Sequence, residues 1–161
     1  MGHAIPIPMP TASADARDNR QFESKYIVAG SLDGDATTKA LDGENFEATL
    51  SSFAAASRGN PELVARNEDM RGKLADALGQ VDDEATLRAF ACSRHLCVAE
   101  VRAGAGRQSI DYTGFLTDEL EREKLGIYVQ VSSNEQVGDM TSFRTFFSMT
   151  PAIRSIRAPS Q

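Results

Sequence analysis

The sequence predicts an α+β domain in which two helices precede a four-stranded, mostly antiparallel sheet covered by helices on one face. Three observations lead to this prediction. Two apolar segments flank Cys92 and Cys97 as the strands of a hairpin, residues 61–78 carry helix start and stop signals, and two later segments alternate apolar with polar residues. Because helices and strands come in runs without strict alternation, they favour α+β over a parallel α/β sheet.

The chain is predicted to divide into three parts: a flexible N-terminal arm over 1–43, a single α+β domain over 44–151 and a C-terminal tail over 152–161. Residues 1–21 are rich in proline and small residues and show no helical or strand period. Residues 26–29 are read as a short strand or an apolar anchor. Residues 31–43 are polar with two Asp-Gly pairs, which predicts a loop.

Two helices are expected next, over 44–57 and 61–78. The first has an apolar stripe that includes Phe46 and Phe53. The second is well delimited, since Asn60 is a good N-cap, Pro61 suits the first helical position and Gly79 lies just past the expected end. The face of the second helix comprises Leu63, Asn67, Met70, Leu74 and Leu78.

A β-hairpin is predicted over residues 86–102, with a four-residue loop over 93–96. Direct pairing of Cys92 with Cys97 places Phe90 opposite Ala99, and by the same alternation Arg88 opposite Val101. Directly opposed residues lie within the Cα separation that a disulfide needs.

A third helix over 112–125, stopped by Gly126, leads to two more strands. Residues 127–131 alternate cleanly, residues 132–140 form a polar connection, and residues 141–149 alternate again. Phe143, Phe147 and Met149 share one side of the last strand. Phe146 lies on the other side, where it is either a second packing surface or exposed.

Cys92, His95 and Cys97 form the one metal-like cluster of the sequence, and three interpretations of it stay open. The cysteines form a disulfide, remain free thiols, or join His95 in a zinc or copper site. The disulfide is favoured because opposed cysteines point at each other and His95 lies at the loop tip. A redox-active dithiol is disfavoured because the spacing is four and the context is strand and turn.

The composition excludes several classes of function. A net charge of −6 argues against a nucleic-acid surface, and no apolar run is long enough to span a membrane. No signal peptide is visible, and the opening Met-Gly-His is interpreted as a cloning remnant that precedes an already trimmed protein. A pair of cysteines poised to bridge predicts a periplasmic or secreted protein.

The segment Phe90-Ala-Cys-Ser-Arg-His-Leu-Cys-Val-Ala-Glu-Val resembles one found in small exported proteins of proteobacteria. In those, an apolar strand is followed by a cysteine, four residues, a second cysteine and another strand. The resemblance covers about residues 60–150. It implies a periplasmic or surface-exposed domain with a disulfide, and it transfers no catalytic residue because these proteins share no known activity.

The function expected from the sequence is therefore a non-enzymatic exported protein-binding module, either an accessory of envelope machinery or an inhibitor or immunity-type protein. No catalytic residue and no cofactor is predicted. Another protein is the expected partner, and a second copy of the chain is a further candidate. The alternatives are a metal-handling protein that uses Cys92, His95 and Cys97 and a small hydrolase with converging carboxylates. The expected binding surface comprises Arg94, His95, Leu96 and Phe146.

Overall fold

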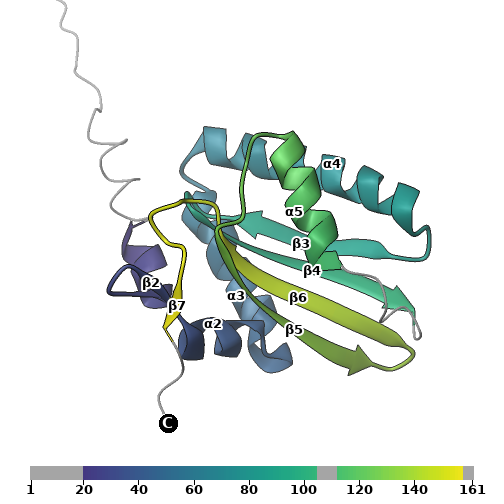
Figure 1. Cartoon of the computed structure of the whole chain (residues 1–161), viewed down its shortest axis with the longest axis horizontal. Helices are drawn as coiled ribbons and strands as arrows, with labels where there is room; N and C mark the ends of the chain where they lie inside the picture. Colours follow the sequence, from purple (N-terminus) through teal and green to yellow (C-terminus); the bar gives the residue numbers. More distant parts are fainter. Residues whose placement is uncertain (1–19, 105–111, 158–161) are drawn as a thin grey trace, which may run out of the picture.

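The computed structural model of the protein describes residues 20–104 and 112–157 and has the predicted α+β architecture (Figure 1). The described part begins with small elements, and larger helices and a sheet follow. In order, the elements are a 3₁₀ helix η1 (Ser24–Tyr26), β1 (Ile27–Val28), β2 (Ser31–Asp33), α2 (Gly34–Leu41), α3 (Gly43–Ser57), α4 (Pro61–Val81), β3 (Thr86–Cys92), β4 (Leu96–Gly104), α5 (Tyr112–Arg122), β5 (Val129–Val137), β6 (Met140–Ser148) and β7 (Ile156–Arg157).

The main sheet has four strands in the order β3-β4-β6-β5, and every neighbouring pair is antiparallel. This confirms the predicted sheet. A second, small sheet has the order β1-β2-β7, with β2 and β7 parallel. The larger sheet carries most of the core, because β4 and β6 lie at its centre and are buried along most of their length.

The hairpin of β3 and β4 has the predicted register at its tip and departs from it at its base. Cys92 lies opposite Cys97 and Phe90 opposite Ala99, as predicted. A β-bulge between Leu87 and Ala89 then places Leu87, rather than Arg88, opposite Val101. The prediction for Arg88 is thus wrong, because the extra residue of the bulge turns this charged side chain toward the face that carries Glu100.

Helix α4 covers one face of the sheet together with α5 (Figure 1). Its start is as predicted, since Asn60 Oδ1 accepts hydrogen bonds from the N–H groups of Glu62 (3.0 Å) and Leu63 (3.3 Å). Its end is not, because the helix continues through Gly79 to Val81. The predicted face is confirmed: the residues buried on α4 are Leu63, Asn67, Met70, Leu74 and Leu78.

Helices α2 and α3 cover the opposite face, so the expectation of helices on one face only is wrong (Figure 1). The physical reason is that both sets of alternating residues on the central strands are buried. Val98 and Phe146 are fully buried on the α3 side, just as Ala99 and Phe147 are on the α4 side. A sheet that is apolar on both faces requires cover on both.

The structure also differs from the expected arm and tail. Residues 1–19 and 158–161 of those two segments lie outside the described residues. Within residues 20–43, the predicted loop over 31–43 is instead β2 followed by α2, which Asp33 caps by accepting a hydrogen bond from Asp35 N (3.0 Å). Leu32 and Leu41 are fully buried, and Ile153 of the expected tail is largely buried beside them. These apolar side chains anchor both segments on the domain.

The strand predicted over 127–131 is longer than its alternation indicated, whereas the strand predicted over 141–149 has the expected length and is shifted by one residue. Strand β5 begins at Val129 and continues to Val137 through the polar residues expected to form a connection, and a two-residue turn at Gly138 and Asp139 leads into β6. Helix α5 ends before the predicted Gly126. Lys124 adopts a left-handed conformation (φ 63°), and Leu125 N donates to Leu120 O (2.8 Å), which closes the helix there.

Candidate functional site

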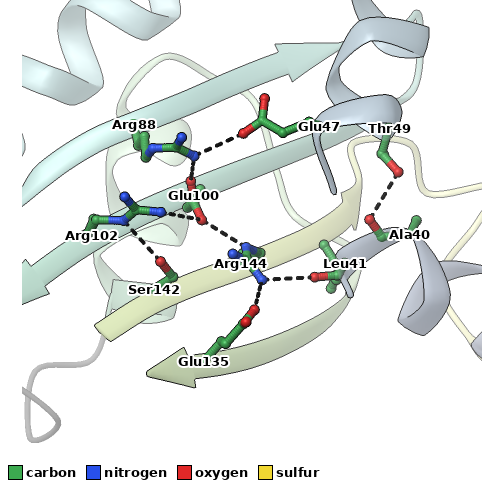
Figure 2. A network of polar contacts seen from close by, with 10 residues as sticks. All are labelled: Ala40, Leu41, Glu47, Thr49, Arg88, Glu100, Arg102, Glu135, Ser142 and Arg144. Atoms are coloured by element: carbon green, nitrogen blue, oxygen red, sulfur yellow. Dashed lines mark hydrogen bonds and ion pairs between the residues drawn. The ribbon is translucent and has the colours of Figure 1, made fainter. Parts of the chain in front are cut away.

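A network of charged residues interrupts the apolar layer on the α2/α3 face of the sheet (Figure 2). Its centre is Glu100 on β4, which is completely buried. The carboxylate contacts three arginines from β3, β4 and β6: Arg88 Nη1 lies 2.6 Å from Oε1, Arg144 Nε lies 2.8 Å from Oε2, and Arg102 Nη2 lies 3.8 Å from Oε2. The alternation of three neighbouring strands thus brings these charges to one place.

Arg144 connects this centre to the edge of the sheet. Its guanidinium also donates to Glu135 on β5 and to Leu41 O (3.3 Å) at the end of α2. The same group lies over the ring of Phe46, 5.1 Å from the centroid. Arg144 itself is only 6% exposed. It therefore holds together β4, β5, β6 and the corner between α2 and α3.

The environment of Glu100 decides what its carboxylate can do chemically. Burial alone would raise its pKa, but the hydrogen bonds from Arg88 and Arg144 outweigh burial and hold the pKa below its usual value. The group remains ionised at neutral pH and is closed off from solvent. A general acid or base needs a pKa near the working pH and access to a substrate, so Glu100 is suited to neither role.

A hollow opens beside this network, between α2 and strand β5, with a volume of about 840 Å³. Most of the residues that line it are polar or charged in type, and Leu41 is the one large apolar residue among them. The lining residues are Asp35, Thr38, Lys39, Leu41, Asp42, Gly43, Ser133, Asn134, Glu135 and Arg144. The hollow thus follows the outer part of β5.

The two edge strands of the four-stranded sheet, β3 and β5, differ in how far their outward backbone groups are covered. At the tip of the β3–β4 hairpin, Ser93 N donates to Leu96 O (2.8 Å). Hydrogen-bonded and non-hydrogen-bonded pairs alternate along an antiparallel ladder, so the backbone N–H and C=O groups of Phe90 and Cys92 point away from β4, toward the edge of the sheet. Side chains of α4 cover those groups: Arg71 Nη2 donates to Phe90 O (2.8 Å) and Asn67 Nδ2 donates to Cys92 O (3.0 Å). The outward carbonyl groups of Phe90 and Cys92 are thereby satisfied within the domain, whereas Thr86 and Arg88 at the base of β3 are exposed.

The β5 edge has no such cover in the described part of the chain. Met149 N donates to His95 O (2.8 Å). By alternation along β6, the backbone N–H and C=O groups of odd-numbered residues therefore point toward β4, and those of even-numbered residues point toward β5. By the register of β5 and β6, Ser132, Asn134 and Gln136 then direct their backbone groups outward. All three residues are exposed. Strand β5 is therefore the open edge of this sheet.

Of the four residues predicted to form a binding surface, two are exposed in the structure and two are buried. Arg94 and His95 are exposed at the hairpin tip, whereas Leu96 and Phe146 are fully buried. The assignment of Leu96 and Phe146 to a surface is therefore corrected. Phe146 is a packing residue because its ring contacts those of Tyr26 and Phe53, with centroids 4.8 and 5.6 Å away.

Glu23, which no pattern in the sequence singles out, lies at the hairpin tip. Glu23 is only 4% exposed, and its carboxylate accepts hydrogen bonds from the Ser93 hydroxyl and from His95 N (2.8 Å). Its other oxygen lies 3.0 Å from His95 Nδ1. Burial raises the pKa of Glu23, but the hydrogen bonds from His95 and Ser93 outweigh burial and lower it overall. No local pattern connects residues 70 positions apart.

Replacing Glu23 by Gln is expected to destabilise the protein by about 2 kcal/mol at pH 7, since hydrogen bonds to a charged group are lost. Because the pKa of Glu23 is lower in the folded than in the unfolded chain, this contribution is present above the usual value of about 4.3 and lost as the pH falls through the lowered pKa. Urea denaturation of both proteins between pH 7 and pH 3 measures the difference. The exposed Glu68→Gln is the control, and a difference that is independent of pH would contradict the assignment.

The cysteines form the disulfide that the sequence favoured. Cys92 and Cys97 are bonded, with Cα atoms 4.0 Å apart, at a pair that is not hydrogen-bonded across the strands. In this oxidised state their sulfur atoms are not thiolates available to a metal. Across the described ranges, no three His, Cys, Asp or Glu side chains are grouped so as to hold a metal ion.

Comparison of the chain with protein-family models, with curated proteins and with solved structures finds no match. What the structure supports of the resemblance to exported proteins is the disulfide between two cysteines that are separated by four residues. Such a bond is consistent with an oxidising compartment. None of the helices in the described residues combines the length and the apolar character required to cross a bilayer.

Proposed function

We propose that this protein is a non-enzymatic protein-binding module of the periplasm or the extracellular space, acting as an accessory of envelope machinery or as an inhibitor or immunity-type protein. It binds its partner by accepting an extended segment of that partner as an additional strand at β5. This mode of recognition obtains affinity from main-chain hydrogen bonds and specificity from alternate side chains.

The open β5 edge is the observation that carries the proposal. Strand β5 is half-buried over its first three residues and mostly exposed from Ser132 to Val137. An exposed strand edge offers unpaired N–H and C=O groups, and proteins usually protect such edges. Within the described residues, α4 side chains cover the carbonyl groups of Phe90 and Cys92 at the β3 edge, whereas Ser132, Asn134 and Gln136 at the β5 edge are exposed. A difference between the edges of one sheet is expected where one of them is used for binding.

Two further observations support the non-enzymatic and extracytoplasmic parts of the proposal. Glu100 is the most buried carboxylate of the network and is held ionised by arginines, which suits a structural role. The disulfide and the resemblance of its hairpin to exported proteins favour an oxidising compartment.

Photo-crosslinking tests the proposal. A photoreactive residue replaces exposed Gln136 at the β5 edge or, as a control, exposed Glu68 on α4, and the protein is irradiated in envelope extract. We expect a discrete adduct with another protein from position 136 and none of the same mass from position 68. Asn134→Pro removes an outward N–H and blocks strand addition, so it should abolish the adduct, whereas Asn134→Ala should retain it.

Folding of the proline variant is checked by its circular dichroism and thermal midpoint, and Gln136→Pro, crosslinked from position 132, serves as a second edge-blocking variant. An adduct that persists in both proline variants would contradict binding at this edge, as would the absence of any adduct specific to position 136.

A further inference from the structure

We infer that the segment added to β5 is basic, with lysine or arginine side chains on the face that lies over the hollow between α2 and β5. This inference rests on the proposed function and specifies the chemistry of the partner.

The alternation of β5 determines which partner side chains reach the hollow. Val129 and Val131 pack on the α2/α3 side, so the side chains of Ser133 and Glu135 lie on that side as well. An added strand places every second side chain next to them. Those side chains meet Glu135 across the strands and Asp42 on the opposite wall of the hollow.

The charge of this surface selects cations. Of the residues that line the hollow, Asp35, Asp42 and Glu135 are exposed acids, and Lys39 is an exposed base. Glu135 and Arg144 are paired with each other, so the charges that remain on the wall are those of Asp35, Asp42 and Lys39, with an excess of one negative charge. Opposite charges across neighbouring strands stabilise the pairing and like charges destabilise it.

The same charges disfavour a second copy of the chain as the occupant. A second β5 would bring its own Glu135 and its acidic hollow to the interface, and each chain carries a net charge of −6. A partner with alternating basic residues instead supplies the charge that this surface lacks.

Titration with synthetic peptides tests the inference. The probe is a fluorescent peptide of alternating lysine and threonine, about eight residues long to match a strand, and the control peptide has glutamate in place of lysine. We expect the lysine peptide to bind at least about tenfold more tightly than the glutamate peptide. Binding should protect the backbone amides of Ser132, Asn134 and Gln136 from hydrogen exchange and should be lost in Asn134→Pro.

Matched charge reversals separate a local effect from the net charge. The double variant Asp35→Lys, Asp42→Lys should weaken binding of the lysine peptide about tenfold, whereas Glu68→Lys, Asp76→Lys on α4 makes the same change of net charge and should leave it within about twofold. Equal affinity of both peptides, lost in Asn134→Pro, would overturn the charge inference and leave strand addition standing. A dimer in sedimentation that Asn134→Pro dissociates would make a second copy the occupant and also overturn it. Lack of binding by either peptide, with no edge-specific adduct in the extract, would overturn both proposals.

Discussion

Replacing Glu100 by Gln is expected to destabilise the protein by about 3–5 kcal/mol, because the change leaves buried arginine charge without its main counter-ion. Glu100 is completely buried and Arg144 is 6% exposed, so solvent cannot compensate either group. In a protein of this size such a loss lowers the thermal midpoint by about 10 °C. Urea denaturation of the wild type and the variant measures the free energy directly.

Two controls make the Glu100 result interpretable. Lys73→Gln removes exposed ion pairs with Asp69 and Glu123 and should change the stability by less than about 0.5 kcal/mol. The double variant Glu100→Met, Arg144→Met removes both charges and should recover most of the loss, since apolar side chains can replace a buried ion pair. A cost below about 1 kcal/mol for Glu100→Gln would show that the network does not contribute to stability as described.

Replacing Phe146 by Ala is expected to lower the free energy of unfolding by about 3–5 kcal/mol, because packing contacts are lost and a cavity is left behind. The ring is completely buried and contacts Tyr26 and Phe53. The matched control is Tyr128→Ala, because Tyr128 is 45% exposed and its loss should cost less than about 1 kcal/mol. Calorimetry on both variants measures the effect, and an unchanged stability in Phe146→Ala would return this residue to the surface that the sequence suggested.

The parts of the fold that could be predicted are those with strong local signals. Asn60 and Pro61 specify the start of α4, and the spacing of Cys92 and Cys97 specifies the pairing at the tip of the hairpin. The alternation over 141–149 located β6, although the same pattern left Phe146 undecided. It could not be decided because an apolar residue on the second face of a strand is buried only if another layer covers it, and α3 lies about 90 residues earlier in the chain.

The missed parts lack such signals for physical reasons. The outer half of β5 is polar because it lies at an edge with little apolar cover, so it has no hydrophobic alternation to detect. Helix α2 is short, with few large apolar residues. Glu100 lies between the apolar residues Ala99 and Val101, which is the pattern of a strand with one exposed face. Its burial depends on Arg88, Arg102 and Arg144, which the sheet topology brings together.

Under the proposed strand addition at β5, the side chains of α4 that cover β3 would also limit how large an assembly this domain can form. A sheet with one accessible edge can gain a strand on one side only, so addition stops after a single partner. If Asn67 and Arg71 no longer engaged the carbonyl groups of Cys92 and Phe90, each molecule would expose two complementary edges. Head-to-tail contacts of that kind do not close and grow into fibres. If β5 accepts a strand as proposed, two polar side chains on α4, rather than residues of β5, would keep the complex finite.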